Sequence, residues 1–563
     1  MRIETDKGIY RPGEVAQCYT DSTWKDGKLR LTLYHAETAV AVKETETRKH
    51  AFSFQLPEKD GQGYLLKAES LDENGRVTDR AFAALDCSGD WTRFPRYGYI
   101  WDYRAEAEPE DKIRVLNRYH LNGLQFYDWQ YRHHIPVAPD LREWDDWSGR
   151  KISGAILHRY IEQAHAAGMV CMAYNMIYAA NMTYLTDGSG VSPEWRLVKQ
   201  DGTDFTCDMN AELGPVGILQ YFNPLNRKWQ DYIFAKEREV LERLGFDGWH
   251  GDTIGEMGPM MTADGSPLGY SPDGEKIECV KDCYTPFLNA AKDAISPGYL
   301  AFNPVGAQGI ENVNKSHADV LYTEFWPWDR DDRGALYDDY YSIHRAILNA
   351  AEQSGGKSLI VAGYINYKNP SEWFNEPAVR LMDSVVFASG GSRIELGNGD
   401  GMLSNEYFPD DRYKKMDPET RLAVERLYDF VTAYENLLRD GQTNVQRATE
   451  IPGITVSETG RSNTVWHFCR MDATYEIHHF INLIGTDNEW RDVEQRKPAP
   501  KKQNRLTVRI RTEREVHTVY LASPDREDLL PVKVDHVWGR DEKSAYIQFE
   551  MDELVYWNMV FLR

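Results

Sequence analysis

The stretch GFDGWHGD at residues 245–252 decides the fold, because it is a short apolar run that ends in a carboxylate and belongs to a series. Similar runs alternate with longer segments of helical spacing along the middle of the chain. This alternation predicts parallel strands joined by crossover helices, and eight strand–helix units close a (β/α)8 TIM barrel. The predicted strands lie in residues 97–103, 121–128, 168–175, 245–252, 299–305, 319–326, 359–366 and 384–396.

On both sides of this series the apolar residues alternate with a period of two. Leu29, Leu31 and Leu33 show the pattern near the start, and residues 556–562 show it at the end. Such alternation, with Asn-Gly and Asp-Gly turns, is typical of antiparallel sheets. We therefore predict a multidomain protein: an immunoglobulin-like β-sandwich over 1–92, a catalytic (β/α)8 barrel over 93–440 and an antiparallel C-terminal β-sandwich over 441–563.

The charge of the 563-residue chain limits the class of partner. Asp and Glu number 88 against 65 Lys and Arg, which gives a formal net charge of -23. A polyanion would be repelled over most of the surface, so we expect no nucleic-acid partner and no anionic membrane surface as partner. A neutral ligand is favoured.

The cysteines and the first residues bear on the compartment. Seven scattered cysteines do not form a disulfide framework. The first residues lack the basic and apolar regions of a secretory signal, so we expect a cytoplasmic protein, or an extracellular one if a signal had been removed. We expect no metal at Cys279 and Cys283, although their spacing places both on one side of a helix.

Two carboxylates stand where predicted strands end, which in a barrel is the catalytic end. Asp252 ends the fourth run among glycines, whose backbone amides could keep it ionised as a nucleophile must be. Glu324 ends the sixth run between aromatic residues, where lost hydration would raise its pKa as a general acid requires. Such a pair, about 5–5.5 Å apart, is the equipment of a retaining glycosidase. The alternative is that these carboxylates form salt bridges or bind Mg²⁺.

Aromatic residues are abundant, with 16 Trp, 33 Tyr and 20 Phe. An aromatic ring can pack on the C–H face of a sugar, while neighbouring polar groups bind its hydroxyls. Core packing is the competing role for any single Trp. Many rings fall in the predicted loops at the catalytic end: Tyr127, Trp129, Tyr131, Trp144, Trp147, Tyr178, Trp249, Trp326 and Trp328.

Three segments, residues 121–129, 245–252 and 322–326, together resemble glycoside hydrolase family 66, the dextranases and cycloisomaltooligosaccharide glucanotransferases. The resemblance covers nearly the whole chain. It implies the three-domain order given above and cleavage of α-1,6-glucan with retention of configuration. It also implies that Asp252 is the nucleophile and Glu324 the acid/base, with no cofactor.

Other residues at strand ends or in the following loops are predicted to contact the glucan or isomaltooligosaccharide. These are Tyr127, Asp128, Trp129, Tyr174, Asn175, Trp249, His250, Trp326, Asn366, Glu395 and Asn398.

Several alternatives stay open. Cyclising members of the family carry a carbohydrate-binding module inserted in the barrel, and no inter-strand segment here is long enough for one, which favours endohydrolysis over a cyclising transglycosylase. A non-catalytic glucan-binding protein could have the same fold. A metal-dependent hydrolase would need a ligand cluster, but the sequence has no His-Glu-x-x-His motif and no calcium loop of EF-hand spacing.

Overall fold

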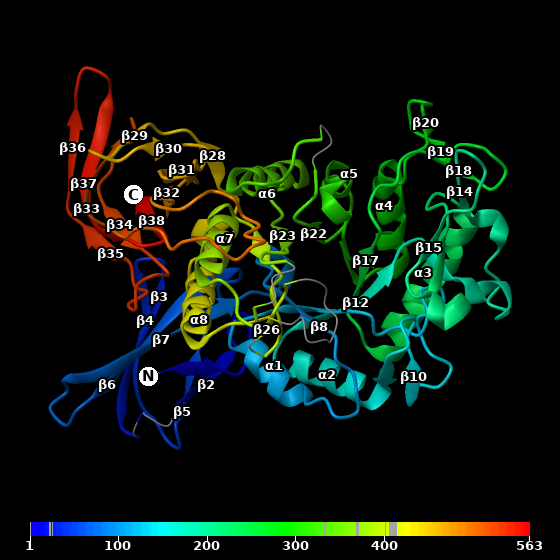
Figure 1. Ribbon diagram of the computed structural model, residues 1–563. Coiled ribbons are helices and arrows are strands. Elements are labelled where there is room, and N and C mark those ends of the chain that lie inside the picture. The colour runs from blue at the N-terminus through cyan, green and yellow to red at the C-terminus, as the bar shows by residue number, and fades with distance from the viewer. Residues whose placement is uncertain are drawn as a thin grey trace.

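The computed structural model describes residues 2–21, 24, 26–330, 334–367, 371–399, 401–404 and 414–563. Its centre is an eight-stranded parallel sheet in the order β24-β23-β22-β21-β17-β12-β9-β8, with helices on its outer face (Figure 1). The strands are β8 (Tyr97–Ile100), β9 (Gly123–Phe126), β12 (Val170–Met176), β17 (Gly248–Asp252), β21 (Tyr299–Phe302), β22 (Val320–Phe325), β23 (Leu359–Gly363) and β24 (Ser392–Arg393).

Helices follow the strands along the chain, as the alternating pattern predicted. They are α1 (Pro109–Asn117), α2 (Gly154–Ala166), α3 (Arg227–Leu244), α4 (Tyr284–Ile295), α5 (Ile310–Asn314), α6 (Tyr340–Ser354), α7 (Glu376–Ala388), α8 (Pro418–Ala433) and α9 (Glu435–Leu438). Asp417 caps the N-terminus of α8, where its side chain accepts a hydrogen bond from the Thr420 amide at 2.8 Å.

The eighth predicted strand was wrong over most of its length. Of residues 384–396, the first five belong to α7, and only Ser392 and Arg393 form a strand of the barrel sheet. The reason is burial. Residues 381–388 are all buried, and the apolar run at 385–388 has the same local sequence pattern as a buried strand.

The two ends of the sheet approach each other and nearly close a barrel. β25 (Leu396–Asn398), which follows β24, packs beside β8. A Cβ atom built at Gly98 would lie 2.8 Å from the Leu396 carbonyl oxygen, and one at Gly397 would lie 2.4 Å from the Tyr99 ring. Only glycine allows this approach at both positions.

Side chains alternate between the two faces of each barrel strand. Inward-facing residues form one buried cluster that includes Tyr97, Met172, Tyr322 and Ile360. Outward-facing residues join a much larger core with the helices. The interior of the barrel is therefore packed with side chains.

Long excursions follow three of the barrel strands on one side of the sheet. Residues 129–152 and 176–225 form two such excursions, and a third follows β17. Their strands are β10 (Glu143–Asp145), β11 (Lys151–Ser153), β13 (Ala179–Asn181), β14 (Leu197–Lys199), β15 (Thr206–Asp208), β16 (Ile218–Tyr221), β18 (Met260–Thr262), β19 (Gly269–Tyr270) and β20 (Lys276–Ile277).

Before the barrel, two antiparallel sheets enclose a common core that contains Leu29, Leu31 and Leu33. The predicted alternation is confirmed at these residues, whereas the immunoglobulin-like topology and the domain limits stay predictions. One sheet has β1 (Ile3–Thr5), β2 (Val15–Thr20) and β5 (Ala51–Gln55); the other has β4 (Thr38–Glu46), β3 (Lys28–His35), β6 (Gln62–Leu71) and β7 (Val77–Cys87).

After the barrel, two more sheets face each other across a core that includes Val508, Ile547 and Val560. The first also packs on the barrel helices, where the Trp557 ring lies 5.1 Å from that of Phe430 in α8. It contains β28 (Thr443–Val445), β30 (Val456–Ser457), β31 (Val465–Met471), β32 (Glu476–Asn482), β38 (Trp557–Leu562), β34 (Val519–Ala522) and β35 (Val532–Val534). The second contains β29 (Thr449–Glu450), β33 (Gln503–Arg511), β37 (Ala545–Leu554) and β36 (His536–Arg540).

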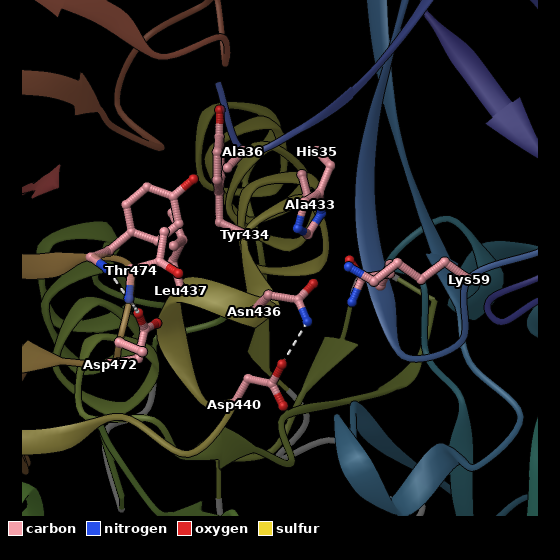
Figure 2. A pocket seen from close by; sticks show the side chains of 13 residues that line it. His35, Ala36, Lys59, Ala433, Tyr434, Asn436, Leu437, Asp440, Asp472 and Thr474 are labelled. Atoms are coloured by element: carbon pink, nitrogen blue, oxygen red, sulfur yellow. Dashed lines mark hydrogen bonds between the residues drawn. The ribbon is translucent and has the colours of Figure 1, made fainter. Parts of the chain in front are cut away.

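The three regions meet around a cavity of about 330 Å³ (Figure 2). His35 of β3, Asn436 of α9 and Asp472, which precedes β32, line it. The Asn436 amide donates hydrogen bonds to the Gly61 carbonyl and to the Asp440 carboxylate, and its oxygen accepts one from the Gly63 amide. Polar contacts therefore fix the first region against the end of the barrel.

Arg96, just before β8, is fully buried and holds the first region and the barrel together. Its guanidinium donates to Asp86 of β7 at 2.6 Å and to Glu435 of α9 at 2.8 Å, and both carboxylates are also fully buried. Removing one partner of a buried ion pair leaves uncompensated charge in a medium that solvates it poorly.

We expect Arg96→Met to lower the free energy of unfolding by about 3–5 kcal/mol, because Asp86 and Glu435 would stay buried and would both lose the guanidinium that binds them. The melting temperature measured by calorimetry should fall accordingly. Arg30→Met is the matched control, since Arg30 pairs with Glu44 on the surface and such pairs contribute about 0–1 kcal/mol. Equal losses in the two variants would contradict this account.

No helix in the described ranges is long and apolar enough to cross a membrane.

Candidate active site

Asp252 and Glu324 lie on nearby barrel strands at the end where the long excursions begin. Asp252 is the last residue of β17, Glu324 lies in β22, and only β21 separates the two strands. The residues two positions earlier, His250 and Tyr322, meet inside the barrel with ring centroids 4.7 Å apart. Because side chains alternate along a strand, Asp252 and Glu324 also face inward, one layer above these rings.

Two side chains donate hydrogen bonds to Asp252. The Tyr174 hydroxyl of β12 binds Oδ2 at 2.7 Å, and the Asn303 amide binds Oδ1 at 2.9 Å. Asn303 directly follows β21, the strand between the two carboxylates. Each oxygen of Asp252 is thus held by a donor from a neighbouring strand, which fixes the plane of the carboxyl group.

Two aromatic side chains donate hydrogen bonds to Glu324. The Tyr364 hydroxyl, after β23, binds Oε1 at 2.8 Å, and the Trp326 indole nitrogen binds Oε2 at 3.1 Å. The two rings stack on each other with centroids 3.8 Å apart. The carboxyl of Glu324 therefore rests against aromatic surface, as its sequence neighbours predicted.

Burial raises the pKa of both carboxyl groups, and the negative charge of Glu324 raises the pKa of Asp252 further. The expectation that glycine amides keep Asp252 ionised was wrong, because its hydrogen-bond donors at 2.7 and 2.9 Å are side chains and their effect is smaller than that of burial. Like charges at short range make it costly to ionise both groups. The state with one proton on the pair is therefore favoured, so that one carboxyl can act as an acid while the other is ionised.

Three of the predicted contact residues lie beside the carboxylates. Tyr174 and Trp326 bind them directly, and the ring of Tyr127 packs on that of Tyr174 at 4.6 Å. His250 lies below them in the barrel, parallel to the Tyr97 ring at 5.9 Å and buried. Burial lowers the pKa of His250 to about 3, so it is a neutral part of the floor.

Three other predicted contacts were wrong because their side chains face the helices. Trp129 is fully buried, with its ring 5.0 Å from that of Phe246. Trp249 packs near Phe287 of α4, and the Asn175 amide donates to Glu237 of α3 at 2.6 Å. Asn175 and Trp249 are strand neighbours of Tyr174 and His250, and adjacent residues point to opposite faces.

Polar residues at three further predicted positions hold the structure together and are fully buried. Asp128 accepts from the Trp147 indole at 3.0 Å and pairs with Arg150. Asn366 donates to the Asp492 carbonyl at 2.7 Å, and Glu395 pairs with Arg393. These side chains are committed to protein partners, which corrects the expectation of sugar contacts. The side chain of Asn398 lies outside the described residues.

Asn303 and Tyr364 were missed, although both follow the rule that found Asp252. Each is the first residue after a strand, β21 or β23, and each is polar where an apolar run stops. The predicted runs were drawn too long, to residues 305 and 366, and this placed both strand ends three residues late.

Two groups of potential metal ligands occur in the described part of the chain, and both lie apart from the carboxylate pair. One consists of His165, Cys171 and Asp247; the other consists of Cys469, Glu476 and His478. In the second group Arg447 already binds both oxygens of Glu476, at 2.7 and 3.2 Å. Neither group contains Cys279 or Cys283.

Comparisons with known proteins identify the same family that the three sequence segments resemble. The model of glycosyl hydrolase family 66 matches residues 5–561. A cycloisomaltooligosaccharide glucanotransferase from Niallia circulans is 26% identical over 724 aligned residues, covering 100% of this chain and 71% of that enzyme. A dextranase from Streptococcus salivarius is 26% identical over 570 residues, covering 89% of this chain and 67% of that enzyme.

Solved structures share the fold. A cycloisomaltooligosaccharide glucanotransferase from Paenibacillus sp., complexed with cycloisomaltoheptaose, has a TM-score of 0.88 at 24% identity and covers 100% of this chain and 99% of its own. A noncanonic maltogenic α-amylase from Thermotoga neapolitana has a TM-score of 0.51 at 11% identity, covering 83% of this chain and 99% of its own.

We expect Asp252→Asn to raise the stability of the folded protein at pH 7 by roughly 1–2 kcal/mol, because a buried charge is removed. The sign follows from linkage: a carboxyl whose pKa is higher in the folded state costs stability as pH rises above its unfolded value of about 4. The gain should therefore shrink as pH falls toward 4.

Thermal unfolding from pH 4 to pH 8 measures this difference between the variant and the parent protein. Asp273→Asn, at an exposed aspartate, is the control and should change stability little at any pH. A variant at position 252 that is less stable than the parent at pH 7 would refute the account.

Proposed function

Because the chain belongs to glycosyl hydrolase family 66, we propose that it is an endo-acting enzyme that cleaves the α-1,6-glucosidic bonds of dextran by double displacement. The observation that carries this proposal is the inward placement of Asp252 and Glu324 at one end of the barrel, each held by two hydrogen-bond donors. The products would be isomaltooligosaccharides.

In the first step the ionised Asp252 attacks the anomeric carbon, and the bond from that carbon to the glucosidic oxygen breaks. Glu324 gives its proton to this oxygen, which leaves as the hydroxyl of the released chain. A covalent glycosyl ester on Asp252 remains. The assignment requires the single proton of the pair to lie on Glu324, with Asp252 ionised, when the glucan is bound.

In the second step Glu324, now ionised, takes a proton from water as the water oxygen attacks the anomeric carbon. The ester bond breaks, and Asp252 leaves as a carboxylate. Two inversions give net retention. The donors from Tyr174 and Asn303 hold the nucleophile in the plane needed for attack, and those from Trp326 and Tyr364 aim the acid/base at the glucosidic oxygen.

The substrate class comes from the relatives, one of which is named for dextran and one for cyclic isomaltooligosaccharides. The net charge of -23 is compatible with a neutral glucan. The proposed chemistry needs no metal or other cofactor, since protein carboxyls supply both acid and nucleophile.

Hydrolysis is favoured over cyclising transfer by the alignment lengths. The alignment with the glucanotransferase spans 724 residues, 161 more than the 563 of this chain, so the relative has at least that many residues, in total, without a counterpart in this chain. The alignment with the dextranase spans 570 residues. Cyclising transfer is the second candidate, because glucanotransferases are also among the relatives.

Asp252→Ala and Glu324→Gln should each abolish the release of reducing sugar from dextran. We expect a loss of at least about a hundredfold for the acid/base, because general acid catalysis contributes 10²–10⁴-fold. Product chromatography and NMR of the first-formed anomer test endo cleavage and retention. Inversion, or full activity in either variant, would overturn the mechanism; mainly cyclic products would favour the second candidate.

Removing a hydrogen bond to one of the two carboxyls should shift one limb of the pH profile of kcat/KM on dextran, and the limb that shifts should differ between the two carboxyls. Tyr364→Phe removes a donor that lowers the pKa of Glu324, so the alkaline limb, where the acid loses its proton, should move to higher pH. Tyr174→Phe removes a donor that lowers the pKa of Asp252, so the acidic limb should move to higher pH. A shift of both limbs to lower pH would contradict the assignment.

A further inference from the structure

Four aromatic side chains form a continuous array that starts at Glu324 and ends in solvent. The rings of Tyr364 and Trp326 lie 3.8 Å apart at 13°, and those of Trp326 and Trp328 lie 5.3 Å apart at 17°. The Tyr367 ring stands nearly perpendicular to both tryptophans, at 5.6 and 5.1 Å. The rings of Tyr364, Trp326 and Trp328 are therefore nearly parallel and form one stack that begins at the Glu324 carboxyl.

The two ends of this stack differ in what they contact. Tyr364 and Trp326 donate hydrogen bonds to Glu324, so their positions serve the carboxyl. Trp328 makes no such bond with Glu324, and 52% of its surface is exposed, the largest exposure of any tryptophan in the described residues. An exposed indole face costs hydrophobic free energy and is typical of a surface that binds a ligand.

The turn that carries Trp328 is held in place. Asp329 accepts from the Trp326 amide at 2.8 Å and returns a hydrogen bond from its own amide to the Trp326 carbonyl at 3.1 Å. Arg491 donates to the Pro327 carbonyl at 3.0 Å. A ring fixed before binding loses little conformational entropy when a sugar packs on it.

We propose that Trp328 is the platform for the sugar on the leaving-group side of the cleaved bond, and that it sets the share of glycosyl groups transferred to sugar instead of water. This inference rests on the proposed function. The direction follows from chemistry: the acid/base must lie at the glucosidic oxygen, and the stack begins at that group. Sugar units beyond that oxygen would pack their apolar C–H faces on the outer ring.

The same platform holds an acceptor after the first product has left. A hydroxyl oxygen of the acceptor sugar attacks the anomeric carbon of the ester, Glu324 takes the hydroxyl proton, and Asp252 leaves as a carboxylate. The new bond is a glucosidic bond, so the atoms balance as in hydrolysis with sugar in place of water. A sugar that stays longer on Trp328 competes better with water.

The test compares the transfer-to-hydrolysis ratio of Trp328→Ala, Trp328→Phe and the parent enzyme. Each acts on isomaltosyl fluoride with isomaltose as acceptor, and released fluoride is compared with free reducing sugar and longer oligosaccharides. We expect the ratio to fall about fivefold in Trp328→Ala, because stacking on a ring contributes about 1 kcal/mol. Trp328→Phe should retain most of the ratio.

The matched control is Trp538→Ala, at an exposed tryptophan of β36, which should keep the parental ratio. The inference is overturned if Trp328→Ala keeps the parental ratio, or if Trp328→Phe falls as far as Trp328→Ala. A parent enzyme with no activity on dextran or on the fluoride would instead overturn the proposed function. The two failures are therefore distinguishable.

Discussion

The repulsion between two carboxyl groups in one poorly hydrated barrel end is the constraint on which the rest of the site depends. Water is too scarce there to stabilise two negative charges, so burial raises the pKa of Asp252 and of Glu324, and each charge disfavours the other. The four donors around them limit this cost without removing it. A site of this kind lowers the stability of the folded state, and what it gains is the proton transfer and nucleophilic attack proposed for the pair.

The sequence supported the barrel, the two flanking sheet regions and both carboxylates, because each depends on local patterns. Alternating apolar residues revealed the sheets, and polar residues after apolar runs revealed Asp252 and Glu324. The sequence did not show which of two adjacent side chains on a strand faces the barrel interior. Tyr174 and Asn175 are adjacent, yet one binds Asp252 and the other binds Glu237 of α3, and only the position of a strand in the sheet decides which faces inward.

Wrongly placed strand ends account for most of the other wrong predictions of site residues. The two predicted strands were each three residues too long, so the prediction passed over Asn303 and Tyr364 and selected Asn366, whose amide binds Asp492. Aromatic content gave no guide to exposure: Trp129 and Trp249 lie in the core, whereas Trp328 lies at the surface. Asp492 and Arg491 are remote in sequence from the barrel residues that they contact, so tertiary structure was needed to explain why Asn366 and Pro327 are held.

The aromatic floor beneath the carboxylates limits how molecules reach them. In the part of the chain that the structure describes, the rings of His250, Tyr97 and Tyr322 pack against one another and fill the barrel interior beneath the carboxylates. In the proposed mechanism, the departing half of a cleaved chain and the molecule that replaces it would both pass through the end of the barrel where the carboxylates lie. The proposed ester intermediate would then be shielded from bulk solvent until the first product has left, so its lifetime would depend on product departure as well as on bond chemistry.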